Sequence, residues 1–141
     1  MKNTLILHRT IAICGSMKLK ERMLEVGRQL EESGYKILYP NLTETNDYTT
    51  MSASEQAQTK HRMIVDHLEK IKTADAILVI NERLKETDNY IGANTFLEMG
   101  FAFSMDKKIF LLQDIPDQPN KVELAGLLPT VLHGNLSKLT V

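Results

Sequence analysis

Residues 76–81, AILVIN, form an apolar run in which polar positions do not alternate with apolar ones. A strand with one face in water alternates along its length, whereas a strand covered on both faces is apolar throughout. Coverage on both faces is typical of parallel sheets, because the helices that connect parallel strands lie on both sides of the sheet. This run therefore predicts an α/β fold built around a parallel sheet.

The rest of the sequence alternates between strand-like and helix-like segments. Strands are predicted at residues 10–16, 35–41, 76–81, 107–114 and 130–136, and helices at 18–32, from about residue 60, around Glu98 and at 123–129. Without repeats or linkers, residues 1–141 are predicted to form a single domain with a three-layer, flavodoxin/Rossmann-like fold and a parallel five-stranded sheet in the order 2-1-3-4-5. The polar, aperiodic residues 42–59 are predicted to be a long loop that covers the binding edge.

Composition excludes several classes of partner. A formal net charge of −1 gives no field that would attract a nucleic acid polymer or an anionic membrane, and no apolar run is long enough for a membrane span. Cys14 is the single cysteine, and the start, MKNTLILHRT, has too short an apolar stretch for a signal peptide, so a reducing, cytoplasmic setting is predicted. His8, His61 and His133 show no ligand spacing, so we expect no metal cluster and no organic cofactor.

Ligands of such a sheet bind beyond the carboxyl ends of the strands, where the strand order reverses. Gly15 and Ser16 follow the first strand, while Asn81 and the loop before Glu98 follow the third. Free backbone N–H groups after Gly15 would favour an anion such as phosphate. An ordinary turn with Ser16 as a helix cap explains the same residues equally well. The turn matches neither G-x-G-x-x-G nor a Walker loop, which disfavours a dehydrogenase or an NTPase.

Glu98 is a carboxylate in an otherwise apolar helix, a costly arrangement unless its charge is held or used. One interpretation is structural, because Thr95 and Glu98 fit the T-x-x-E capping box of a helix start. The other is functional, because Asn94 lies one turn earlier and Gly92 leaves room for a ligand. Apolar neighbours would raise the pKa of Glu98, whereas the helix N-terminus and Thr95 would lower it, and we expect the lowering to win near neutral pH.

His67 falls on the same helical face as Leu68 and Ile71 and is therefore predicted to point inward. An inward histidine is more often a hydrogen-bonded core residue than a catalyst. Since this helix leads into the third strand, its start is expected to lie away from the mouth of the site. Asp66 is expected to pair with Lys70 on the solvated face.

Four segments in order resemble the nucleoside 2-deoxyribosyltransferase superfamily, which includes the 2′-deoxynucleoside 5′-phosphate N-hydrolases. They are IAICGSM, HLEKIKTADAILVIN, YIGANTFLEMGFAF and KKIFLL, and the resemblance spans residues 10–112 and, more weakly, the C-terminus. It implies a flavodoxin-like fold, and a homo-oligomer, a dimer or larger, in which a neighbouring subunit completes each active site. An apolar surface all round the Glu98 helix also predicts a covering subunit.

The resemblance implies that Glu98, followed by Gly100, is the nucleophile, and that the turn from Gly15 to Met17 borders the nucleoside or its 5′-phosphate. This sequence departs from the best-known members in two ways. His67 stands where they carry an aspartate, and the glycines two and four residues before the nucleophile are replaced by other residues. We take Glu98 and His67 as the catalytic candidates. The substrate-binding candidates are Gly15, Ser16, Met17, Asn81, Tyr90, Gly92, Asn94 and Thr95.

Three functions remain open from the sequence. The first is cleavage or transfer of the N-glycosidic bond of a small (deoxy)nucleoside or nucleoside 5′-monophosphate through Glu98, with no metal or cofactor. The second is a nucleotide-binding sensor or partner module of the same fold without turnover, which the missing aspartate favours. The third is cleavage of the same kind of bond in NAD or ADP-ribose.

Overall fold

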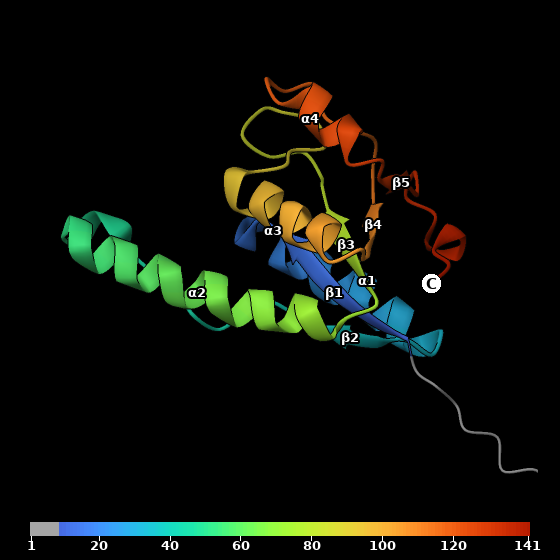
Figure 1. Cartoon of the computed structure of the whole chain (residues 1–141), viewed down its shortest axis with the longest axis horizontal. Helices are drawn as coiled ribbons and strands as arrows, with labels where there is room; N and C mark the ends of the chain where they lie inside the picture. Colours follow the sequence, from blue (N-terminus) through green and yellow to red (C-terminus); the bar gives the residue numbers. More distant parts are fainter. Residues whose placement is uncertain (1–8) are drawn as a thin grey trace, which may run out of the picture.

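The computed structural model describes residues 9–141 and confirms the predicted architecture. Five parallel strands form one sheet in the order β2-β1-β3-β4-β5 (Figure 1). The strands are β1 (Thr10–Gly15), β2 (Lys36–Leu38), β3 (Ala76–Ile80), β4 (Lys108–Leu111) and β5 (Thr130–Val131). The expectations about a signal peptide and about His8 concern residues outside the described range.

Helices cover both faces of the sheet, as the continuous apolar run of β3 predicts, and every residue of β3 is buried. One face carries α1 (Lys20–Glu32), which packs through Met23, Val26 and Leu30. The other face carries α2 (Ala53–Thr73), α3 (Ala93–Ser104) and α4 (Lys121–Gly126). Three short 3-10 turns, Met17–Leu19, Tyr48–Thr50 and Leu136–Lys138, complete the described elements. Within residues 9–141 we find no helix long and apolar enough to cross a bilayer.

The start of α2 differs from the prediction. The helix begins at Ala53 rather than near Lys60, so the second half of the expected loop is helical. Ser52 caps the helix in a reciprocal capping box with Glu55. The first turns of α2 project beyond the other helices (Figure 1), where no core selects apolar residues at helical spacing. The prediction of a loop to residue 59 is therefore wrong, and the irregular segment spans residues 39–52.

Candidate active site

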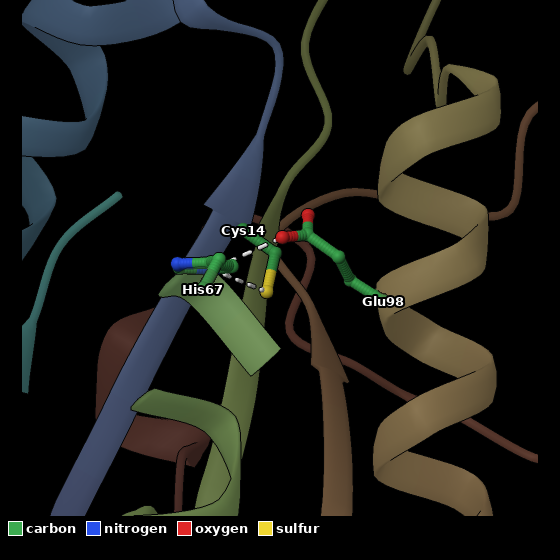
Figure 2. Close-up of side chains that lie close together, drawn as sticks. All are labelled: Cys14, His67 and Glu98. Atoms are coloured by element: carbon green, nitrogen blue, oxygen red, sulfur yellow. Dashed lines mark hydrogen bonds and ion pairs between the residues drawn. The ribbon is translucent and has the colours of Figure 1, made fainter. Parts of the chain in front are cut away.

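Three side chains from three separate elements meet at the carboxyl end of the sheet (Figure 2). Cys14 comes from β1, His67 from α2 and Glu98 from α3. His67 Nε2 lies 3.5 Å from Cys14 Sγ and 3.3 Å from Glu98 Oε2. The same ring nitrogen thus faces both the thiol and the carboxyl group, and all three side chains are buried. We call these residues the Cys14–His67–Glu98 cluster.

Periodicity explains why the three side chains converge. Strand alternation sends Ala12 and Cys14 to the face that α2 and α3 cover, while Ile11 and Ile13 face α1. His67 shares the buried stripe of α2 with Ile71, which confirms its inward orientation. Glu98 lies on the buried stripe of α3, whose buried residues are Thr95, Glu98, Met99 and Ala102.

The expectation that α2 begins away from the mouth of the site is wrong. A helix that leads into a parallel strand ends at the amino edge of the sheet, so it starts at the carboxyl edge, where ligands bind. His67 therefore lies beside the candidate site. The expected pairing of Asp66 with Lys70 is also not formed, because Lys70 Nζ donates a hydrogen bond to the Tyr39 carbonyl at 2.7 Å.

The capping-box interpretation of Thr95 and Glu98 is wrong as well. The cap residue of α3 is Gly92 and the helix begins at Ala93, so Glu98 lies more than one turn inside it. The Glu98 residue is 7% exposed. Because a carboxyl group at this depth cannot satisfy the free N–H groups of the first turn, the structural explanation drawn from the sequence does not apply. The contact that the structure gives Glu98 instead is His67.

Burial governs the protonation of the cluster. It raises the pKa of Glu98 to about 8, against a smaller lowering by Lys60. Burial, followed by the charge of Lys70, lowers the pKa of His67 to about 4, while the Ile13 backbone raises it. Burial and then Glu98 raise the pKa of the Cys14 thiol. All three groups are therefore mainly uncharged at neutral pH, and the expectation that Glu98 is mainly ionised is wrong, because desolvation outweighs the helix dipole.

A small cavity borders the cluster. Its lining residues are Gly15, Met17, Pro40, Asn41, Glu44, Met63, Asp66, His67, Lys70, Asn94 and Glu98. Its interior of about 50 Å³ holds little more than a water molecule or two. A wider hollow of about 360 Å³ shares Met17, Glu44 and Met63 with it and is also lined by Lys20 and Lys60. A larger surface hollow beside β2 shares four lining residues but reaches neither His67 nor Glu98. We place the candidate site at the small cavity because two residues of the cluster, His67 and Glu98, line it.

Of the substrate-binding candidates, Gly15, Met17 and Asn94 line this cavity together with Glu98 and His67. The remaining candidates have other neighbours, and their roles in binding stay predictions. Ser16 caps the 3-10 turn by accepting a hydrogen bond from the Lys18 N–H, as the alternative interpretation expects. Gly92 caps α3 and Thr95 is buried within it. The Tyr90 ring lies beneath Lys85 Nζ, 5.3 Å from its centroid.

The side-chain amide of Asn81 already makes three hydrogen bonds within the protein. Its Nδ2 donates to the carbonyl oxygens of Gln113 and Asp114, each at 3.0 Å, and its Oδ1 accepts from the Gln113 N–H at 2.9 Å. The residue is fully buried, and it joins the end of β3 to the chain that follows β4. This side chain therefore holds the carboxyl edge of the sheet together and is not among the residues that line the cavity.

Two features favour glycine at position 15: the close packing around its Cα and its place in the lining of the cavity. Its φ is +154°, and a Cβ there would lie 3.0 Å from both the Ile80 carbonyl oxygen and Met23 Cε. The backbone oxygen of Ile80 cannot move away as a flexible side chain would. A bulky residue at position 15 would thus strain the junction of β1 and β3 in addition to closing the cavity.

Several site residues were missed by the sequence reasoning: Cys14, Asn41, Glu44, Met63, Asp66 and Lys70. For Cys14 a signal was present, because it directly precedes the Gly15 turn at the end of a strand. For the others no local pattern existed, because their proximity to Glu98 depends on how α2 and the segment 39–52 cross the edge of the sheet.

The sequence matches no protein-family profile and no curated protein. Among solved structures, the chain is similar to a 2-deoxyribosyltransferase from the psychrotolerant bacterium Bacillus psychrosaccharolyticus. The two share 19% sequence identity over 72% of this chain and 70% of that chain, with a TM-score of 0.54. That enzyme is described as a biocatalyst for the synthesis of nucleosides.

At this level of identity the similarity shows a shared fold. It agrees with the α/β architecture described above.

The segment 39–52 is predicted to cover the site when a ligand binds. It contributes Pro40, Asn41 and Glu44 to the cavity, and Glu44 pairs with Arg62 at 2.6 Å. Because the cavity holds little more than a water molecule or two, the segment would have to move to admit a larger ligand. Hydrogen exchange of its amides should slow when a bound nucleotide closes the site, while exchange at residues 136–138 stays constant. Equal exchange in the segment with and without nucleotide would contradict a covering role.

Proposed function

We propose that this protein cleaves or transfers the N-glycosidic bond of a (deoxy)nucleoside or nucleoside 5′-monophosphate. The observation that carries the proposal is a buried carboxyl group, Glu98, at the floor of a cavity on the binding edge of the sheet. The similarity of the fold to a 2-deoxyribosyltransferase supports this class of reaction.

In the proposed reaction, the ionised Glu98 attacks the anomeric carbon of the sugar. A C–O ester bond forms as the C–N bond breaks, and the electron pair of that bond leaves with the base, which takes up a proton. Water or the nitrogen of a second base then attacks the same carbon and releases the Glu98 carboxylate. Glu44 and Asp66, the other carboxyl groups in the cavity lining, are our candidates for supplying the proton.

His67 is proposed as the positioning residue for Glu98. Its Nε2 lies 3.3 Å from Glu98 Oε2, and a neutral imidazole that carries its proton on Nε2 would donate a hydrogen bond to the ionised carboxylate. Such a bond favours the charged form that attack requires and restricts the rotation of the side chain.

The charged residues of the adjoining hollow, two lysines and the carboxylate of Glu44, favour an anionic group there. Lys20 and Lys60 line the adjoining hollow, and Lys18 lies in the turn that follows β1. A sugar placed over Glu98 with its 5′-substituent toward this hollow would bring a phosphate close to these lysines. We therefore propose that nucleoside 5′-monophosphates are better substrates than nucleosides.

A panel of nucleosides, nucleoside 5′-monophosphates, NAD and ADP-ribose, each incubated with the protein and separated by chromatography, tests the function. Release of free base from a nucleoside or its monophosphate is the expected result. Release of nicotinamide from NAD would instead assign NAD or ADP-ribose as the substrate class. A thermal shift with no free base from any compound would identify the chain as a nucleotide-binding sensor and contradict the enzyme.

The rate of the proposed reaction should rise with pH. Because the attacking form of Glu98 is the carboxylate and its pKa is raised to about 8, only a minor fraction is active at neutral pH. In metal-free protein, kcat/KM should increase about tenfold per pH unit below that pKa and level off above it. A profile between about pH 6 and about pH 9 measures this, and a flat profile would contradict a nucleophile with a raised pKa.

We also propose that the protein is a homo-oligomer. Two large apolar side chains of α3, Leu97 and Phe103, are 43% and 53% exposed, on a helix whose other face carries Glu98. Light scattering at micromolar concentration should give at least twice the mass of one chain. The matched variants Leu97→Glu and Phe103→Glu should shift the measured mass toward that of one chain. A wild-type monomer would contradict the proposal.

A further inference from the structure

We propose that the Cys14–His67–Glu98 cluster is a zinc-binding site. Geometry is the first observation. A tetrahedral Zn²⁺ ion has ligand distances of about 2.3 Å to sulfur and about 2.0 to 2.1 Å to nitrogen or oxygen, so its sulfur and nitrogen ligands lie about 3.5 Å apart and its nitrogen and oxygen ligands about 3.3 Å apart. The corresponding distances in the protein are 3.5 Å from Cys14 Sγ to His67 Nε2 and 3.3 Å from His67 Nε2 to Glu98 Oε2.

The third pair of donors, Cys14 Sγ and a Glu98 carboxylate oxygen, lies within 4.8 Å, so a side-chain movement of about 1 Å or less brings it to the roughly 3.6 Å of a tetrahedral zinc ion. One atom each from Cys14, His67 and Glu98 forms a set within 4.8 Å of one another, and the three side chains come from β1, α2 and α3 (Figure 2). Burial keeps all three side chains in restricted conformations, which limits the entropy lost on binding an ion.

The chemistry of the donors selects the ion. A thiolate, an imidazole and a carboxylate suit zinc, whereas Mg²⁺ and Ca²⁺ prefer oxygen ligands alone. The thiolate and the carboxylate carry one negative charge each, so a Zn²⁺ complex with neutral His67 has no net charge. A neutral complex is the form that a buried site tolerates best. The cavity beside His67 and Glu98 leaves room for water as the fourth ligand, an arrangement typical of open zinc sites.

The other nitrogen of His67 is a second, independent observation. Nδ1 is buried and has no hydrogen-bond partner of ordinary geometry among the described residues, while the Ile13 backbone is close enough to raise the pKa of the ring. Histidines that bind metal through Nε2 present Nδ1–H to a backbone carbonyl or a carboxylate. A small rotation of the ring on binding an ion would direct Nδ1–H toward the Ile13 backbone, whose carbonyl oxygen would accept such a bond.

Zinc at this site would occupy the carboxylate that the proposed reaction needs. This consequence rests on the proposed function, whereas the binding itself does not. Zn²⁺ bound to Glu98 withdraws electron density from the nucleophile and blocks its approach to the sugar. The metal-free chain would then be the form that releases base, and the zinc-loaded chain would be inhibited.

A zinc titration of the full chain tests the site without measuring turnover. Protein freed of metal with a chelator and kept reduced is titrated with Zn²⁺ in competition with a chromophoric chelator. One ion per chain is expected. Cys14→Ser and His67→Gln should each weaken the affinity by more than about 100-fold, since they remove a ligand rather than its neighbour. The matched control His61→Gln, which changes an exposed histidine of the same helix, should bind as the wild type does.

Cobalt gives a readout that does not depend on the stability of the variants. Wild-type protein with Co²⁺ in place of Zn²⁺ should show the charge-transfer absorption of a cobalt–thiolate bond and the strong visible bands of tetrahedral cobalt. Absence of both features, or a zinc affinity equal in wild type and Cys14→Ser, would overturn the site. Tight zinc binding by a protein whose metal-free form releases no base would leave the site standing and contradict the proposed function instead.

Discussion

Glu98→Gln is expected to fold as the wild type does and to lose turnover by orders of magnitude. Glutamine has the shape of the protonated glutamate that predominates at neutral pH, because burial raises the pKa of Glu98 to about 8. The substitution therefore creates neither a cavity nor a buried charge. An amide cannot form the glycosyl ester, so base release from the best substrate of the panel should fall by about 1,000-fold or more.

Two measurements separate this loss from misfolding. Thermal unfolding should give a midpoint within a few degrees of the wild type, as expected for a change of less than about 1 kcal/mol. The matched control Glu69→Gln makes the same chemical change on the exposed face of α2, where the Glu69 side chain is 62% exposed, and should keep full activity. Turnover by Glu98→Gln at the wild-type rate would contradict the proposed mechanism.

Asn81→Ala is expected to lower the free energy of unfolding substantially. It removes three hydrogen bonds to the backbone of Gln113 and Asp114 from a fully buried position. Each such bond contributes about 1 kcal/mol net, and the groups left behind lose their partner, so the loss should be about 2 to 4 kcal/mol. Urea unfolding with an unchanged m-value measures it.

Asn94→Ala is the matched control for this loss. Asn94 is exposed and lines the cavity, so its removal should change the unfolding free energy by no more than about 0.5 kcal/mol. Equal losses in the two variants would contradict the role of Asn81 in joining β3 to the chain after β4. A substrate contact through Asn81 would instead appear as a raised KM in a protein of normal stability.

The fold could be predicted because its signals are local. A continuous apolar run, as in β3, requires cover on both faces, and the helical spacing of Met23, Val26 and Leu30 supplies it. The start of α2 could not be found in the same way. Its first turns project beyond the core, so they carry polar residues without periodicity, and the capping box at Ser52 is the one local signal.

The site was predictable only in part, because it depends on contacts between distant segments. A buried carboxylate in an apolar stretch singled out Glu98 from the sequence. The meeting of Cys14 with His67 depends on α2 running back from the carboxyl edge, which brings residues 53 positions apart into contact. The direction of the Glu98 pKa shift was missed for a similar reason. The helix begins at Ala93, so the carboxyl group lies deeper and farther from the helix end than a start at Thr95 implies.

The central claim is that Glu98 becomes covalently attached to the sugar, and trapping the intermediate tests it most directly. Fluorine on C2, the carbon next to the anomeric carbon, destabilises the positively charged transition states for forming and breaking the glycosyl-enzyme, so an intermediate formed by loss of a good leaving base breaks down slowly and accumulates. Metal-free protein incubated with a fluorinated analogue of the preferred substrate is digested and its peptides are analysed by mass spectrometry. The account predicts that the peptide containing Glu98 gains the mass of the fluorinated sugar, and that Glu98→Gln gains nothing. Base release without any adduct on that peptide, or an adduct on Glu44 or Asp66 instead, would contradict it.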